Sequence, residues 1–305
     1  GTFVAAHDPL QAFLDRRSFD RPSCWAVFNM TFLPRLLPTL FLSVLVAACA
    51  NGPDTSVAYV ERPAELIYAD AFQTMERGQY QLAAAQFDEV ERQHPYSEWA
   101  RRSMLMAAFA NYQANKYDEA VSDARRFISL HPGNRSAPYA YYLIAISYFE
   151  QIVDVGRDQQ ITQQALDALQ QVVRRYPESR YATDARLKID MTRDHLAGKE
   201  MDIGRWYLRR NYHLAAVNRF QNVVRDYGTT SHVPESLHRL VEAYVALGLD
   251  SEATQVASVL GYNFPGSDWY ENSYNLLTRE GIAIEDAVNQ RDPTFIERAM
   301  QRIFG

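Results

Sequence analysis

The feature that most constrains the fold is a fixed spacing of alanine, apolar residues and a terminal Pro or Gly, which recurs five times between residues 83 and 265. A short polar or aromatic segment ends in Pro or Gly at each recurrence, and an alanine stands twelve residues before that terminator. The terminators are Pro95, Pro132, Pro177, Gly228 and Pro265, and the alanines are Ala83, Ala120, Ala165, Ala216 and Ala253. Apolar residues also stand eight and five positions before each terminator, from Phe87 and Val90 in the first recurrence to Ala257 and Leu260 in the last.

The spacing of these positions predicts helices. Residues four and seven places apart lie on one face of a helix, and a proline ends a helix because it cannot continue the hydrogen-bond ladder. The intervening sequence is rich in Ala, Gln, Glu, Arg and Leu and shows no sustained alternation of the kind that strands require. The pattern is similar to the second half of the tetratricopeptide repeat (TPR), and Ala71, Ala108, Ala145 and Gly204 fit the small position of the first half. We therefore expect an all-α TPR superhelix of five helix pairs.

The distances between terminators divide the repeats into two blocks. Successive terminators are 37, 45, 51 and 37 residues apart. The third unit carries extra residues between its helices, from Val153 to Gln160, and the stretch from Tyr181 to Arg210 is typical of one long helix. This predicts a block of units one to three over 63–180, a block with the long helix and units four and five over 181–266, and C-terminal capping helices or tail over 267–305.

An apolar run near the N-terminus ends in a cysteine. Of the two cysteines, Cys24 and Cys49, neither lies in the repeats, so a disulfide framework is excluded there. Cys49 could be a core residue, half of a disulfide or a modified residue. The run over 36–48 follows Arg35 and is too short to span a bilayer, but it fits the apolar part of a signal peptide over 30–48. We take residues 1–29 as a disordered or spurious extension.

The four residues that end this run, Val46-Ala47-Ala48-Cys49, resemble the bacterial lipobox. That resemblance implies cleavage before Cys49, a diacylglyceryl group on its thiol, an acyl group on its new amine, and a lipidated linker over 49–62. Each buried methylene of such chains contributes about 0.8 kcal/mol, so two or three chains hold a protein on a membrane. In enterobacterial lipoproteins an Asp at the next position favours retention at the inner membrane, so by resemblance Ala50 permits export to the outer membrane.

Composition and motifs argue against several functions. The formal charge of -6 disfavours a broad nucleic-acid-binding surface. No Gly-rich phosphate loop, nucleophile elbow or cysteine ligand cluster occurs in the sequence, and His232 and His238 lie six apart, which is poor spacing for two ligands on one helix face. We expect no enzyme activity, no metal, and no cofactor besides the covalent lipid.

The first helices of units one to three place aromatic and aliphatic residues at the positions that face inward in a TPR superhelix. These side chains are either ordinary core between helices or a groove for an extended peptide or hydrophobic chain end. The candidate groove residues are Tyr68, Phe72, Leu105, Phe109, Tyr112, Tyr139, Tyr142, Ile146 and Phe149.

The order of lipobox, short linker and five repeats with a break after the third resembles the BamD family, the lipoproteins of the outer-membrane β-barrel assembly machinery. The segments ELIYADAFQTMERGQYQLAAAQFDEVERQHPYSEWA and WYLRRNYHLAAVNRFQNVVRDY carry this resemblance. It implies a non-catalytic, periplasm-facing outer-membrane lipoprotein that helps to insert β-barrel proteins. Its implied partners are the POTRA region of BamA, bound through Arg210 and Arg219, other Bam lipoproteins and unfolded outer-membrane proteins.

Two further hypotheses belong to other classes. The chain could be a generic periplasmic TPR scaffold lipoprotein in cell-wall or secretion machinery, without unfolded clients. It could also be an auxiliary subunit of a cell-wall enzyme. The stretch that contains Arg210 and Arg219 favours the assembly hypothesis.

Overall fold

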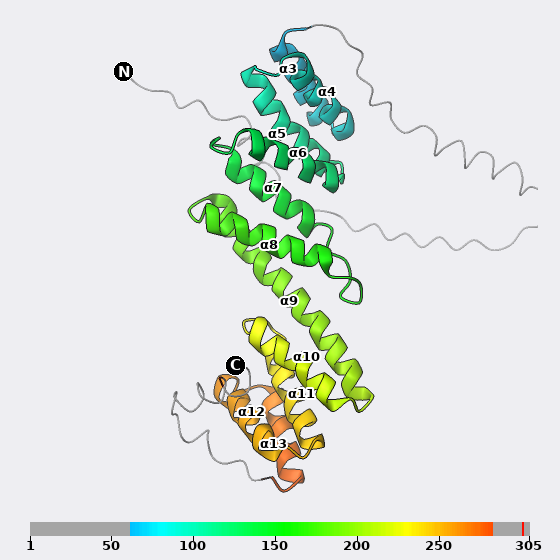
Figure 1. Ribbon diagram of the computed structural model, residues 1–305, viewed down its shortest axis with the longest axis vertical. Coiled ribbons are helices and arrows are strands. Elements are labelled where there is room, and N and C mark those ends of the chain that lie inside the picture. The colour runs from blue at the N-terminus through cyan, green and yellow to red at the C-terminus, as the bar shows by residue number, and fades with distance from the viewer. Residues whose placement is uncertain (1–61, 283–300, 302–305) are drawn as a thin grey trace, which may run out of the picture. The chain divides into compact units, whose positions relative to one another are not determined.

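The computed structural model describes residues 62–282 and residue 301 (Figure 1). The predicted signal peptide, Cys49, the linker up to residue 61 and most of the tail after residue 282 lie outside the described residues. Within them every regular element is an α-helix, labelled as in Figure 1. The helices are α3 (Ala64–Glu76), α4 (Tyr80–Gln93), α5 (Glu98–Gln113), α6 (Tyr117–Leu130), α7 (Ala137–Phe149), α8 (Gln160–Arg175), α9 (Arg180–Arg209), α10 (His213–Asp226), α11 (Val233–Ala246), α12 (Asp250–Asn263) and α13 (Asp268–Arg279).

The predicted helix pairs are confirmed. Each helix from α3 to α12 packs on the next one along the chain, and α13 packs on α11 and α12. First helices also contact one another across units, α3 with α5, α5 with α7, and α7 with α9. This stacking is the architecture expected of a helical-repeat protein, in which each unit contacts its neighbours.

The turn within a unit uses a residue with left-handed backbone conformation. Gly78, Asn115, Asn211 and Gly248 have φ of 79°, 60°, 62° and 70°, and each stands 17 residues before its terminator. Glycine and asparagine tolerate this region at lower cost than other residues. Unit three departs from the rule, because the segment between the end of α7 and Gln160 replaces the tight turn.

The repeated alanines and apolar residues form the core. All five alanines twelve residues before the terminators are fully buried, as the spacing predicts. Gly204 supplies the small position of unit four. A Cβ atom there would lie 2.5 Å from Cε1 of Phe220, so the close approach of α9 and α10 requires glycine.

Helix α9 packs on the third helix pair and on α10. The structure gives it 30 residues, one position earlier at each end than the sequence predicts. Its N-terminal part packs on α7 and α8, while its C-terminal part packs on α10 and contributes Ala197 and Met201 to a core that extends to Leu277 of α13. None of the described helices is long and apolar enough to cross a membrane.

Candidate interaction surfaces

The tyrosines of the predicted groove reach from one first helix to the next. The ring of Tyr68 on α3 lies 4.9 Å from the ring of Trp99 on α5. The hydroxyl of Tyr142 on α7 donates a 2.6 Å hydrogen bond to Asp184 on α9, and its ring stacks on Tyr181. The aromatic residues on this face therefore join successive repeat units.

Four of the nine predicted groove residues are buried. Leu105, Phe109, Tyr139 and Ile146 keep between 2% and 8% of their accessible surface. Burial raises the pKa of Tyr139 well above its usual value, which is the behaviour of a hydroxyl kept from water. The groove prediction is wrong at these positions, because neighbouring helices cover side chains that the repeat register directs inward. They are core residues.

The other five predicted groove residues stay half-buried, and each is within reach of both a neighbour and solvent. These are Tyr68, Phe72, Tyr112, Tyr142 and Phe149. The ammonium of Lys188 lies 4.9 Å from the ring centre of Phe149, and the hydroxyl of Tyr112 lies 3.4 Å from Glu150. This face therefore presents tyrosine and phenylalanine edges together with charged groups, and it is less apolar than the sequence predicts.

Arg219 lies on α10 and is paired within the chain. Its Nη1 atom lies 3.3 Å from both carboxylate oxygens of Glu200 on α9, and Asn222 donates a 3.1 Å hydrogen bond to the same carboxylate. The Arg219 side chain keeps 39% of its surface exposed. A long pair with this exposure contributes little to stability, so the guanidinium can exchange Glu200 for another carboxylate at small cost.

Arg210 caps the C-terminal end of α9 and stacks on an aromatic ring. Its guanidinium carbon lies 4.3 Å from the ring centre of Trp206, one helical turn earlier. The structure places Arg210 at the C-terminal end of α9 and Arg219 in the middle of α10.

Sequence reasoning missed the exposed apolar side chains near Arg210. Trp206, Tyr212 and Leu214 are 42%, 57% and 68% exposed, and all lie at or near the turn between α9 and α10. The spacing of four residues between Trp206 and Arg210 is the signal that could have revealed the stacked pair. We refer to Trp206, Arg210, Tyr212, Leu214 and Arg219 as the α9–α10 surface.

One constellation in the C-terminal block looks catalytic at first sight. The Nδ1 atom of His238 lies 2.8 Å from the hydroxyl of Ser273, and its Nε2 atom lies 3.4 Å from Glu242. Ser273 is fully buried, and its hydroxyl donates to the carbonyl of Trp269, so the imidazole is not placed to take the hydroxyl proton. Burial alone would raise the pKa of Glu242, but the bonds from His238 and Arg239 hold it below its usual value. The group is a structural link between α11 and α13.

A second charged group ties α9 to α11. Arg205 donates to both oxygens of Glu235, and Asp202 accepts a further bond from it at 2.9 Å. These bonds raise the pKa of Arg205 and outweigh the effect of its burial. The described part of the chain contains no cluster of three or more histidine, cysteine or carboxylate side chains suited to a metal ion.

Comparison with known proteins identifies close relatives. The model of the YfiO family, described as outer membrane lipoprotein, matches residues 60–260. A protein of Caulobacter vibrioides named outer membrane protein assembly factor BamD is 56% identical over 247 residues, which cover 81% of each chain. The protein of the same name from Rickettsia prowazekii is 41% identical over 246 residues, covering 80% of this chain and 97% of its own. Among solved structures, the TPR domain of P58(IPK) is similar with 14% identity and a TM-score of 0.37, over 86% of this chain and 67% of its own, which adds nothing to the fold described above.

Proposed function

The chain belongs to the YfiO family of outer membrane lipoproteins, and from this premise we propose that it is a non-catalytic assembly factor that helps β-barrel proteins to fold into the outer membrane. The observation that carries the proposal is the 56% identity, over most of both chains, to a relative named for outer membrane protein assembly. The stacked helix pairs support it, since helical repeats offer extended surfaces for binding other polypeptides. No particular observation favours a generic scaffold of the cell wall or of secretion machinery.

The anchor in this proposal is the lipid on Cys49, which would hold the repeats at the periplasmic face of the outer membrane. The lipobox resemblance of residues 46–49 supports it, together with the small residue Ala50. The residues between Cys49 and the start of α3 at Ala64 would serve as the tether.

Docking to BamA is assigned to the α9–α10 surface. Exposed aromatic side chains beside arginines are typical of the residues that dominate binding energies in protein interfaces. Arg219 and Arg210 supply positive charge, so an acidic and partly apolar surface of the POTRA region is the complementary partner. The other Bam lipoproteins and the unfolded clients are further partners in this proposal, and the half-buried aromatic residues of α3, α5 and α7 are the candidate client surface.

Depletion of the chain in its own host tests the function. As it is depleted, folded outer-membrane barrels, measured by their heat-modifiable mobility in gels, should decline before total membrane protein does. A copy with Cys49→Ser should restore them less well than the wild-type copy, because it lacks the anchor. Barrel amounts that stay constant during depletion would contradict the proposal and favour the generic scaffold.

A further inference from the structure

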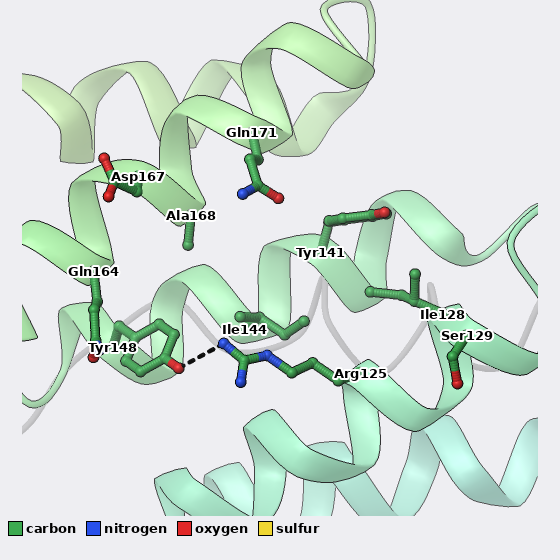
Figure 2. Close-up of a pocket in the computed structure, with 10 residues that line it drawn as sticks. All are labelled: Arg125, Ile128, Ser129, Tyr141, Ile144, Tyr148, Gln164, Asp167, Ala168 and Gln171. Carbon is green, nitrogen blue, oxygen red and sulfur yellow. Dashed lines mark hydrogen bonds between the residues drawn. The ribbon is translucent and has the colours of Figure 1, made fainter.

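A cavity lies where α7 meets α6 and α8. It measures about 390 Å³ and is formed by α6, α7 and α8, which lie around it in Figure 2. Tyr141, Ile144 and Tyr148 of α7 line it. On α7 the half-buried groove residues Tyr142 and Phe149 each stand one position after a cavity residue, Tyr141 and Tyr148, which is about 100° around a helix. The cavity and the predicted groove are therefore lined by different residues.

Arg125 marks one side of the cavity. Its guanidinium donates a 2.9 Å hydrogen bond to the hydroxyl of Tyr148, as Figure 2 shows, and its Cζ atom lies 5.9 Å from the centre of the same ring. Within the described part of the chain, no carboxylate forms an ion pair with Arg125. The neighbouring Arg126, in contrast, pairs with Glu91 at 2.6 Å. Among the described residues, the cation at this rim has the neutral Tyr148 hydroxyl as its hydrogen-bond partner.

The repeat register allows the same location to be compared between other units. Between units one and two, Asp88 stands at the position of Arg125 and Asn111 at the position of Tyr148, each 37 residues earlier in the chain. There Arg126 binds Glu91 and also lies 3.6 Å from Asp123 and 3.8 Å from Asp88, while Asn111 donates to Asp123 at 2.9 Å. Ion pairs within the chain therefore link α4 to α6 at this location.

Between units four and five the equivalent location is packed with valines. Gln221 and Tyr244 replace Arg125 and Tyr148, and they keep the same contact, a 3.0 Å hydrogen bond from the amide to the hydroxyl. Val224, Val256 and Val259 stand at the positions of Ile128, Ala168 and Gln171, and all three valines are buried in the core of that block. Here the interval between second helices is closed by apolar side chains.

Between units two and three, this location has neither the ion pairs of units one and two nor the buried valines of units four and five. Ala168 stands where units one and two have Asp123, and Gln171 stands where they have Arg126. The carboxylate that would pair with a cation is thus replaced by a methyl group, while a cation, Arg125, is present. The α6 and α7 side of the cavity therefore favours a negative charge at Arg125 beside an apolar group at Ile128 and Ile144. The α8 side also carries a carboxylate, Asp167, which no ion pair within the described residues joins to Arg125.

We propose that this cavity is a docking site for a segment of another polypeptide in which a carboxylate side chain adjoins a large apolar side chain. The carboxylate binds Arg125 and the Tyr148 hydroxyl, and charge-assisted bonds of this kind are about twice as strong as neutral ones. The apolar side chain contacts Ile128, Ile144 and Ala168. Asp167 and Gln164 on the α8 side accept hydrogen bonds from backbone N–H groups of the bound segment.

Photo-crosslinking to the full lipidated chain in nanodiscs tests the proposal. The probe is a blocked pentapeptide, Ala-Leu-Glu-X-Ala, in which X is the photoreactive p-benzoylphenylalanine, and its matched form has Gln in place of Glu. Mass spectrometry locates the labelled residues. The Glu probe should label α6, α7 or α8 around the cavity about tenfold more than the Gln probe, the ratio expected for one charge-assisted bond.

Two variants make the result specific to the cavity. Arg125→Gln changes an exposed side chain and should reduce labelling by the Glu probe to that of the Gln probe. Ala168→Asp restores the carboxylate of units one and two inside the chain, so it should also suppress labelling while thermal unfolding stays close to wild type. Arg186→Gln, an exposed arginine on α9, is the matched control and should change nothing.

Several results would overturn the proposal. They are equal labelling by both probes, labelling confined to other helices, no labelling at all, or a preference for Glu that survives Arg125→Gln. If Ala168→Asp fails to fold, the comparison between Arg125→Gln and Arg186→Gln decides by itself. Loss of the preference in both arginine variants would also count against it, since a general charge effect would then explain the labelling.

Discussion

Substitution of Gly204 by alanine tests the packing that joins α9 to α10. The added Cβ atom would lie 2.5, 2.8 and 2.9 Å from three ring carbons of Phe220. Phe220 is fully buried, so its ring cannot move aside without displacing other core residues. Overpacking of this kind costs about 1–3 kcal/mol, while alanine in place of a helical glycine contributes about 1 kcal/mol in the opposite direction.

A second glycine on the same helix separates these two effects. At Gly198 the nearest atoms to a Cβ atom would be Nε2 of His232 at 3.3 Å and two methyl carbons of Val155 at 3.7 Å. Gly198→Ala therefore gains the same helix propensity with little overpacking. The two variants should differ in free energy of unfolding by about 1–3 kcal/mol, with Gly204→Ala the less stable.

Guanidinium unfolding followed by circular dichroism measures this difference, provided that both variants keep the wild-type dependence on denaturant concentration. Adding Phe220→Leu to Gly204→Ala should recover part of the loss, because the smaller side chain removes the ring that the Cβ atom meets. Equal stability of Gly198→Ala and Gly204→Ala, or no recovery in the double variant, would refute the packing argument.

Three further predictions concern single groups. Tyr142→Phe removes the hydrogen bond to Asp184 and should lower the free energy of unfolding by about 1–3 kcal/mol with unchanged helicity; undiminished stability in urea unfolding would contradict this. Partial desolvation and the nearby Asp123 raise the pKa of Asp88 to about 6, against the opposing charge of Arg126 and although the side chain is 53% exposed. The folded chain thus binds the proton more readily than the unfolded chain, whose aspartates titrate at about 3.9. This group's contribution to stability therefore falls as the pH rises from about 4 to 6, and Asp88→Asn should raise the melting temperature more above pH 6 than near pH 4; a difference independent of pH would count against it. Mass spectrometry of the mature N-terminus should find Cys49 with a diacylglyceryl group and an acylated amine, and an unmodified Cys49 would exclude the anchor.

The repeat core could be predicted from the sequence because its signal is local. Buried alanines and apolar residues recur at fixed offsets from each terminator, and the offsets follow directly from helix geometry. The bounds of α9 were correct to one residue for the same reason. The left-handed conformations of Asn115 and Asn211 could also have been read from their position relative to the terminators.

The candidate groove could not be predicted in detail because it depends on how one repeat packs on the next. Tyr142 and Asp184 are 42 residues apart, and only the angle between α7 and α9 brings them together. The same geometry buries Phe109 and Tyr139. Replacing Phe109 by alanine would therefore open a cavity in the core at a cost of about 3–5 kcal/mol, so it cannot serve as a test of peptide binding.

The proposed docking of Arg219 to BamA is the claim on which the functional account depends most, and a pair of neutralising variants tests it. The affinity of the full chain for the periplasmic region of BamA is measured with Arg219→Gln and with Glu200→Gln. We predict that Arg219→Gln weakens binding about tenfold and that Glu200→Gln strengthens it, because the carboxylate that competes for Arg219 is gone. If both variants weaken binding, or neither changes it, the pair has only an intramolecular role and the proposed docking is wrong.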